Sequence, residues 1–205
     1  MATPDSYFED LYGSNDDPWG LATSRYEARK YELTLASLPN HRYRWAFEPG
    51  CSVGVLTLAL ASRCDRLWAC DFQPSAVAAA QRRCKSSPHV TVDRRRIPQD
   101  WPSGPFDLLV LSEICYYFDP VGLARMLNVA LSTLECGATV IAVHWRGQTD
   151  YPLTGDQANQ AVDATPGLVA AVHHVEPEFV LDVWRWGAPP TDKGWPAMHP
   201  TRSKT

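Results

Sequence analysis

The feature of this sequence that most constrains its fold is an alternation between short apolar segments and segments with helical spacing. Residues 106–112 (FDLLVLS) and 138–144 (ATVIAVH) are apolar runs of strand length, separated by a stretch with helical periodicity. The alternation begins near residue 24 and predicts a parallel sheet with helices on both faces. The expected strands are 44–48, 67–70, 89–92, 106–112, 138–144, 168–176 and 179–186, and the expected helices are 24–38, 54–61, 74–84, 121–134 and 155–163.

The last two predicted strands break this alternation. Only a tight connection around Pro177 separates residues 168–176 from residues 179–186. Parallel strands need a crossover of roughly a dozen residues or more, so at least one of the two has to run antiparallel. The expected fold class is therefore α/β, with a doubly wound, mostly parallel, seven-stranded Rossmann-like sheet that carries an antiparallel C-terminal strand.

The chain is long enough for one domain with a substantial core. We expect an N-terminal helical lid over residues 1–39 and a ligand-binding domain over residues 40–186. The segment 187–205 is rich in proline and glycine and is expected to be a flexible tail.

Charge and composition exclude several function classes. The formal net charge of −4 gives no electrostatic footprint for nucleic acid, and no apolar run approaches the ~20 residues that cross a bilayer. The acidic, aromatic N-terminus does not resemble a leader. Six cysteines occur singly, which favours a cytoplasmic protein and argues against a metal site. We expect no nucleic acid, membrane or metal as a partner, and a monomer or weak homodimer.

The segment 47–57 (FEPGCSVGVLT) is a glycine loop between a predicted strand and a predicted helix. A dinucleotide fingerprint would place glycines where Ser52 and Val55 stand, and a P-loop would need a later second glycine followed by lysine. Both phosphate-binding interpretations therefore fail. Gly50 and Gly54 still allow the backbone to approach a ligand closely.

Asp71 follows the next predicted strand, where an acidic residue accepts hydrogen bonds from both ribose hydroxyls of a nucleotide. A loop without a phosphate signature, combined with this acid, favours a nucleoside that carries an amino-acid tail. S-adenosyl-L-methionine, whose methyl-transfer product is S-adenosyl-L-homocysteine, is such a ligand.

On these motifs the sequence resembles the class I S-adenosylmethionine-dependent methyltransferases over roughly residues 40–186. FEPGCSVG resembles the family's glycine motif, WACDF its acidic ribose motif and FDLLVLSEICYYF its strand-four motif. The final two strands match the family's antiparallel seventh strand, inserted beside the fifth. Within the family, the sequence is similar to the small NodS type through DDPW, the glycine loop and SEICYYF, which stands beside the NodS-type AEVLYYL. That resemblance implies an N-methyltransferase, because the NodS type acts on a glucosamine of a chitin-like oligosaccharide.

One position departs from the family pattern. The family commonly has an aspartate after strand three whose side chain meets the adenine amino group, whereas Arg96 and Ile97 occupy this position here. Arginine cannot accept that hydrogen bond. The adenine contact is therefore expected from backbone, from Asp93 or from Asp100.

The resemblance and the strand ends together give the candidate cofactor-binding residues. They are Trp19, Tyr26 and Arg29 from the lid, and Glu48, Gly50, Gly54, Asp71, Phe72, Gln73, Arg96, Ile97, Ser112 and Glu113 from the domain. In the family, the acid at Glu48 helps to orient the amino group of the methionine tail. Each has a structural alternative: the glycines as turn residues, Glu48 as a strand end, Asp71 as a helix N-cap, Phe72 as a core aromatic and the lid as a helix packed on the sheet edge.

Three residues are catalytic candidates. His144 ends a predicted strand beside the presumed acceptor pocket, and Glu113 and Tyr116 follow strand four. Tyr117 and Trp145 are further aromatic candidates for the wall of the transfer site. The alternative for His144 and the tyrosines is a purely structural role. The acceptor pocket is expected from the lid, the segment after residue 144 and Arg125 or Arg185.

Methyl transfer from a sulfonium mainly requires positioning and desolvation. We expect a small-molecule amine as the acceptor, an amino sugar being one such amine. A hydroxyl acceptor, which would need a general base, is the close alternative. A non-catalytic S-adenosylmethionine-binding partner subunit is a further alternative. A nicotinamide-dependent oxidoreductase and a nucleic-acid methyltransferase are disfavoured by the absent dinucleotide fingerprint and by the acidic charge balance.

Overall fold

The computed structural model describes residues 2–187, so that all of the predicted tail except Gly187 lies outside the described residues. In this part of the chain the strands form one seven-stranded sheet in the order β3-β2-β1-β4-β5-β7-β6. The strands are β1 (Ala46–Pro49), β2 (Leu67–Asp71), β3 (Val90–Arg94), β4 (Phe106–Ser112), β5 (Leu134–Trp145), β6 (Leu168–Val175) and β7 (Phe179–Trp186).

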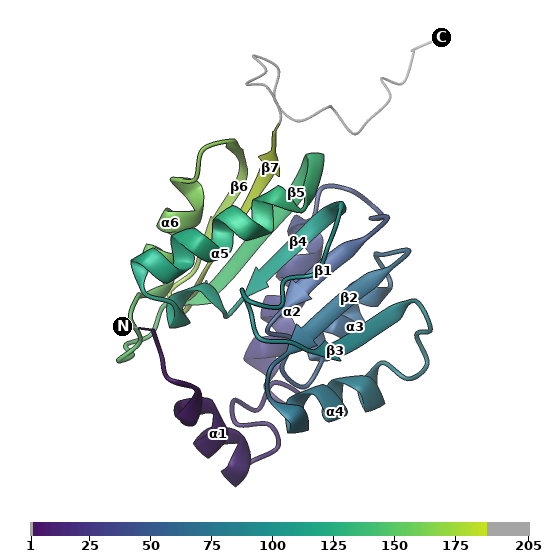
Figure 1. The fold of residues 1–205 in the computed structure, drawn as a ribbon, viewed down its shortest axis with the longest axis vertical. Coiled ribbons are helices and arrows are strands. Elements are labelled where there is room, and N and C mark those ends of the chain that lie inside the picture. Colours follow the sequence, from purple (N-terminus) through teal and green to yellow (C-terminus); the bar gives the residue numbers. More distant parts are fainter. Residues whose placement is uncertain (1, 188–205) are drawn as a thin grey trace.

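The direction of the strands confirms the predicted fold class. Neighbouring strands from β3 to β5 are parallel, whereas β7 runs antiparallel to both β5 and β6. The chain returns from β6 to β7 through the tight connection at Pro177, so β7 inserts between β5 and β6 (Figure 1). This arrangement places the carboxyl ends of β1, β2 and β4 at the same edge, where open α/β sheets bind ligands.

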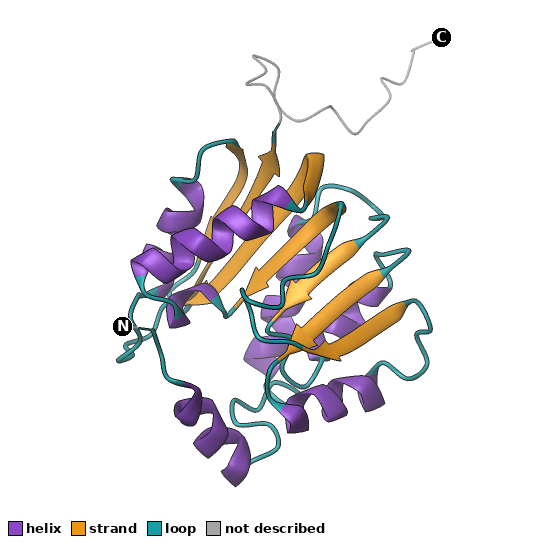
Figure 2. Ribbon diagram, viewed as in Figure 1, coloured by secondary structure: helices purple, strands orange, loops and turns teal. Residues whose placement is uncertain are grey.

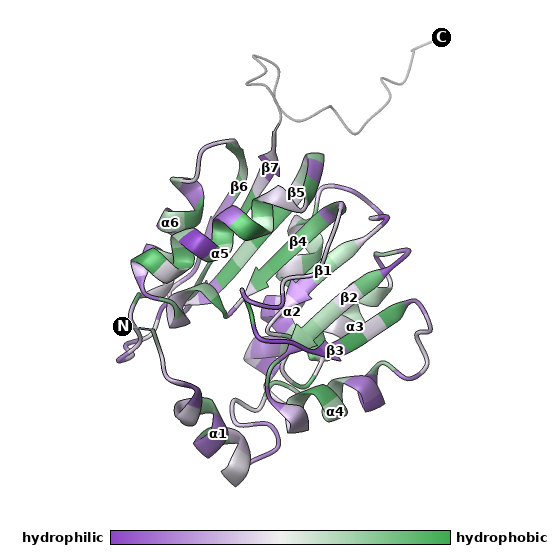
Figure 3. Cartoon of the chain, in the orientation of Figure 1, coloured by the Kyte–Doolittle hydropathy of each residue, from purple (hydrophilic) through white to green (hydrophobic). Residues whose placement is uncertain are grey.

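Helices cover both faces of the sheet, as Figure 2 shows. They are α1 (Asp5–Ser14), α2 (Arg25–Ser37), α3 (Val55–Ala61), α4 (Pro74–Arg83), α5 (Pro120–Ser132) and α6 (Gly155–Asp163), with a short 3-10 turn η1 at Cys115–Tyr117. Side chains that alternate along β4 supply both cores: Leu109 and Leu111 pack with α5 and α6, whereas Leu108 and Val110 pack with α2 and α3. The central strands are the most hydrophobic part of the sheet in Figure 3.

Several helix and strand ends are set by identifiable residues. Ser24 caps α2 by accepting a hydrogen bond from Glu27 N, as its position predicts. Gly54, with a left-handed φ of +78°, is the N-cap of α3, so that helix begins one residue later than predicted. β5 begins at Leu134 rather than at residue 138, because Glu135 and Gly137 continue the strand despite their turn-like character. The helix before it correspondingly ends at Ser132.

The sequence gives no sign of α1, and no helix is predicted there. This helix lies apart from the two helical layers, beyond the carboxyl ends of the strands (Figure 1). Its aromatic side chains contact loops that follow β2 and β4: Phe8 packs edge-on against Phe72 and Tyr117. Among the residues described, no helix has both the length and the apolar composition that a membrane crossing requires.

Candidate functional site

A cavity of about 730 Å³ lies at the carboxyl edge of the sheet. Of the residues predicted for the site, Trp19, Tyr26, Glu48, Gly50, Asp71, Phe72, Arg96, Ile97, Ser112, Glu113 and Tyr116 line this cavity. Four others, Arg29, Gly54, Gln73 and His144, do not. The predicted residues that the structure brings together come from the ends of four strands, β1 to β4, and from the lid, as expected for a ligand that spans the edge of the sheet.

The glycine loop after β1 is held against β2. The amides of Gly50 and Cys51 both donate to the carbonyl of Cys70, at 2.8 and 2.9 Å. Gly50 has a φ of +73°, and a Cβ there would lie 2.9 Å from Ile114 Cδ1. Gly54 has a different task, because a Cβ there would lie 2.7 Å from the Cβ of Ala80 on α4. Gly50 therefore lets the backbone border the cavity, and Gly54 lets α3 and α4 pack closely.

Asp71 is a buried acid held in place by backbone amides. Its Oδ2 accepts from Ser52 N and its Oδ1 from Gln73 N, both at 2.9 Å. Burial raises the pKa of Asp71, and the amide hydrogen bonds oppose that shift. Each oxygen keeps a lone pair for a ligand. Gln73 contributes through its backbone rather than at the cavity wall.

Glu48 is the most perturbed acid of the site. It is 2% exposed, and its Oε2 has no hydrogen-bond partner. Burial raises the pKa of Glu48 to about 8, and the charge of Asp71 adds to the effect. A buried carboxylate oxygen without a donor is unusual and lies where a cationic ligand group would satisfy it.

On the side of the cavity predicted to hold adenine, Arg96 stands where the family commonly has an aspartate. The Arg96 guanidinium lies 5.3 Å from the centre of the Phe72 ring and forms an ion pair with Asp5 of α1. Asp100 accepts from the Arg96 backbone amide and does not line the cavity. Asp93 is likewise away from the cavity and accepts from Trp68 Nε1. Of the three alternatives for the adenine contact, the backbone of the loop after β3 is the one that borders the cavity.

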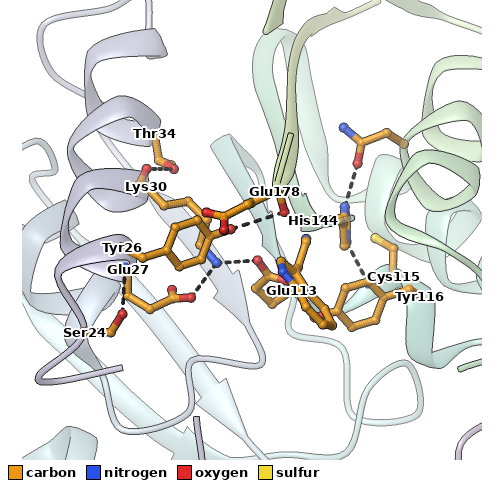
Figure 4. A network of polar contacts seen from close by, with 12 residues as sticks. Ser24, Tyr26, Glu27, Lys30, Thr34, Glu113, Cys115, Tyr116, His144 and Glu178 are labelled. Atoms are coloured by element: carbon orange, nitrogen blue, oxygen red, sulfur yellow. Dashed lines mark hydrogen bonds and ion pairs between the residues drawn. The ribbon is translucent and has the colours of Figure 1, made fainter. Parts of the chain in front are cut away.

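A buried ion network, which the sequence does not predict, also borders the cavity (Figure 4). Lys30 of α2 is 1% exposed and donates from Nζ to Glu27 Oε1 at 2.8 Å and to Glu113 Oε1 at 2.6 Å. Glu113 Oε2 accepts from the Tyr116 hydroxyl at 2.5 Å and from Trp145 N at 3.1 Å. Glu113 has a positive φ of 55°, a conformation that is uncommon for a residue other than glycine.

The charges of this network fix one another. Burial disfavours the ionised form of Glu113, but Lys30, His144 and the Tyr116 hydroxyl together outweigh burial and hold the pKa of Glu113 below its usual range. Burial also opposes the charge of Lys30, and the two carboxylates keep the pKa of Lys30 raised. The sequence carries no clear signal for this network, because Lys30 lies beside Arg29 in a helix with many charged residues.

His144, predicted as a catalytic candidate, does not line the cavity. It is fully buried, and its Nε2 accepts from Cys115 N at 3.0 Å. Its Nδ1 lies 2.6 Å from Asn159 Oδ1. Both ring nitrogens are therefore occupied, and burial lowers the pKa of His144, so the ring is neutral. The strand position was right, but the side chain points toward α6 rather than toward the edge.

The lid residues divide between the cavity and the surface. Trp19 and Tyr26 line the cavity, and the Tyr12 hydroxyl lies 2.5 Å from Ser52 Oγ on the glycine loop. Arg29, predicted to contact the cofactor, instead pairs with Glu176 on the outside, at 2.6 and 2.8 Å.

For the acceptor pocket, Arg125, Tyr117 and Trp145 line the cavity and Arg185 does not. Tyr151, which comes after β5, adds a further ring to this wall. Within residues 2–187 no group of three or more potential metal ligands occurs.

Comparison with known proteins gives a consistent result. The family model of nodulation protein S (NodS) matches residues 9–146. Nodulation protein S of Rhizobium tropici is 32% identical over 112 residues, which cover 54% of this chain and 47% of that protein. The chain thus spans about half the length of this curated relative.

The solved structures that are similar to this chain include the following two. One, from Pseudomonas syringae, is 40% identical with a TM-score of 0.71 and covers 79% of this chain and 99% of that one. The other is the N-methyltransferase NodS of Bradyrhizobium japonicum WM9 in complex with S-adenosyl-L-homocysteine, with a TM-score of 0.78, 24% identity and coverage of 89% and 98%. The latter likeness concerns the fold. The family match extends over most of the chain and includes the glycine loop, Asp71 and the β4 motif, so the chain belongs to the nodulation protein S (NodS) family.

Proposed function

We propose that this protein is an S-adenosylmethionine-dependent methyltransferase whose acceptor is a small-molecule amine, an amino sugar being the narrower case. The proposal rests on the cavity at the carboxyl edge and on membership of the NodS family. A structurally similar member of that family is described as an N-methyltransferase. The six free cysteines, five of them buried, suit the cytoplasm, where thiols stay reduced.

The residues present fit the methyl donor. Glu48 offers a buried carboxylate oxygen to the ammonium of the methionine tail. Asp71 offers free lone pairs to the ribose hydroxyls, and Gly50 removes the Cβ that would crowd the tail. Phe72 offers a ring to the adenine. When bound, S-adenosylmethionine supplies an activated methyl group on a sulfonium.

The observation that favours an amine over a hydroxyl is that neither His144 nor Glu113, the predicted catalytic groups that could act as a general base, is a free base at the cavity. Among the described residues, no histidine lines it. Glu113 has a lowered pKa, and both of its oxygens already accept hydrogen bonds. Lys30 has a raised pKa and therefore holds its proton. A hydroxyl nucleophile needs a base within reach, whereas a neutral amine attacks with its own lone pair.

The charge of the network points the same way. Glu27, Lys30 and Glu113 together carry one excess negative charge beside the cavity. Methyl transfer to nitrogen moves the positive charge from sulfur to the acceptor. A fixed negative charge close to the receiving nitrogen would stabilise that charge as it develops.

The test compares three matched acceptors: glucosamine, N-acetylglucosamine and glucose. S-adenosylhomocysteine release and the mass of the product report the transfer and its position. We expect methylation of glucosamine alone, since acetylation removes the nucleophilic lone pair and glucose offers hydroxyls only. Methylation at oxygen would refute the amine assignment. Donor binding without release of product from any of a panel of amines would instead support a non-catalytic binding subunit.

A further inference from the structure

Behind the cavity, a chain of polar side chains runs from the turn after β4 through three buried residues to the exposed His173 of β6. It begins at the amide of Cys115, which donates to His144 Nε2 at 3.0 Å. It continues from His144 Nδ1 to Asn159 Oδ1 at 2.6 Å and from Asn159 Nδ2 to Asp182 Oδ2 at 2.6 Å. It ends at His173 Nδ1, 2.5 Å from Asp182 Oδ1.

The donor and acceptor order along this chain has one consistent solution. Asp182 accepts from the amide nitrogen of Asn159, which turns the amide oxygen of Asn159 toward His144. Because an amide oxygen can only accept a hydrogen bond, Nδ1 of His144 must carry the proton. The lone pair of Nε2 is then left to accept from the backbone amide of Cys115. His144, Asn159 and Asp182 are 0%, 3% and 8% exposed, so water does not substitute for these bonds.

The turn that His144 holds carries two side chains of the cavity. Glu113 lies two residues before Cys115. Its backbone is left-handed, a conformation that is strained for a residue with a side chain. Tyr116 follows Cys115 and donates to Glu113. A strained turn persists only where its surroundings fix it, and the bond to His144 is one such restraint.

We propose that His144, Asn159 and Asp182 form a positioning relay that fixes the turn after β4 and thereby aims Glu113 and Tyr116 at the methyl-transfer site. The proposal rests on the proposed function for its kinetic readout. It assigns His144 no proton transfer with the substrate. The relay acts on the turn through the hydrogen bond from Cys115 N to His144 Nε2. That bond requires Nε2 to carry no proton.

A charge swap tests this requirement while keeping the hydrogen bonds. In the double variant Asn159→Asp/Asp182→Asn, the new amide at 182 can donate to the new carboxylate at 159, which still accepts from His144 Nδ1. The swap loses the long 3.4 Å bond from Asn159 to the Ala142 carbonyl, and His173 then faces an amide instead of a carboxylate. The carboxylate now adjoins the ring and favours its protonated form. Once protonated, Nε2 carries a hydrogen toward the Cys115 amide, and the bond to the turn is lost.

The groups that face His144 determine the direction of the effect. Glu113 favours the charged ring and Lys30 opposes it, Asp182 favours it from β7, and the ring of Tyr116 lies 5.2 Å away. The swap leaves Glu113, Lys30 and Tyr116 unchanged and brings the carboxylate into direct contact. The pKa of His144 should therefore rise in the swapped variant relative to the native protein.

We expect kcat of the swapped variant to fall about tenfold per pH unit below the raised pKa of His144 and to recover above it. Asp182→Asn alone, the matched control, should show no such acidic limb. His144→Phe, which removes the acceptor, should lower kcat on the order of 10²-fold while the Kd of S-adenosylhomocysteine stays within about twofold. A swapped variant with the native pH profile, or a His144→Phe variant with native kcat, would overturn the relay.

A second readout needs no activity. In a ¹⁵N-labelled sample, the amide resonances of residues 113–117 should titrate with pH in the swapped variant and not in the Asp182→Asn control. Equal titration in both would contradict the relay. Absence of methyl transfer by the native protein would count against the proposed function, and the amide titration would still decide the relay.

Discussion

Replacing Glu48 by glutamine changes one buried carboxyl of the cavity into a neutral group of the same shape. Its Oε2 has no partner in the protein, and burial, followed by the charge of Asp71, raises the pKa of Glu48 to about 8. If the ammonium of the donor binds this carboxyl, binding requires Glu48 to be ionised. Donor affinity and proton release are then linked.

The magnitude follows from the pKa. At pH 7 a carboxyl with a pKa of about 8 costs roughly 1.4 kcal/mol to ionise. Donor affinity should therefore rise about ninefold from pH 6 to 7 and about fivefold from pH 7 to 8, and about 0.9 proton should be released on binding at pH 7. A charge-assisted hydrogen bond contributes roughly 1.5–3 kcal/mol. Glu48→Gln should weaken binding about 10- to 150-fold above pH 8, but only about 1- to 15-fold at pH 7.

Calorimetry with S-adenosylhomocysteine from pH 6 to 8.5, in two buffers of different ionisation enthalpy, measures both quantities. The matched control ligand is 5′-methylthioadenosine, which keeps the nucleoside and lacks the amino-acid tail. Its affinity should not show the Glu48-dependent slope. Native protein without a pH slope for the full ligand, or a slope that survives in Glu48→Gln, would refute the assignment of Glu48 to the ammonium.

The same pKa also predicts a change in stability. Between pH 4.5, the ordinary value, and about 8, the folded protein holds a proton at Glu48 that the unfolded chain has released. Stability from this group is therefore present at low pH and is lost as the pH rises through 8. In the absence of donor, Glu48→Gln should be more stable than the native protein at pH 8.5 and about equal to it at pH 5. Thermal denaturation at the two pH values measures this difference.

The remaining predictions concern other parts of the site. Asp71→Asn should raise the Kd of S-adenosylhomocysteine about 10- to 150-fold, because charge-assisted hydrogen bonds to the ribose are lost; an unchanged Kd would remove Asp71 from the donor site. Arg29→Ala should leave that Kd unchanged, since the side chain faces outward, and a weakened complex would contradict this placement. Lys30→Met should lower the free energy of unfolding by about 3–5 kcal/mol in a urea titration, because two buried carboxylates lose their cation. Gly54→Ala should lower it by about 2 kcal/mol or more, since the added Cβ would lie 2.7 Å from Ala80 Cβ; a native midpoint would show that α3 and α4 relax freely.

The fold was predictable because its central strands β4 and β5 contain long apolar runs and because turn residues separate most of the elements. β4, β7 and α6 have the bounds that the sequence predicts, Phe106–Ser112, Phe179–Trp186 and Gly155–Asp163. The α1 helix was not predictable, since a short acidic segment has little helical signal of its own. Its Tyr12 is buried only because the chain folds back over the glycine loop, a contact without local sequence pattern.

The same distinction separates the predictable from the unpredictable part of the site. Glu48 and Asp71 stand at strand ends beside a recognisable loop, so their position follows from the backbone. The role of Lys30 depends on where α2 packs against the end of β4, which no short motif specifies. For His144, the sequence predicts the position on the strand but not the contacts of the side chain. Its place on β5 was clear, and it shares a face with Val140 and Ala142, but only the fold shows that α6 covers this face and that Asn159 meets the ring.

The insertion of β7 between β5 and β6 has a consequence for the order in which the chain folds. β6 and β7 pair as a hairpin with Val175 opposite Val180, and β7 then pairs with β5, which precedes it by only α6 and β6. β1 instead pairs in parallel with β4, across two intervening strands and helices. Because closing long loops is entropically costly, β5, β6 and β7 should pair with one another before β1 pairs with β4. In pulsed hydrogen exchange during refolding, we expect amides of β7 to become protected before those of β1. The end of β5 that borders the cavity would then be in place before the glycine loop after β1.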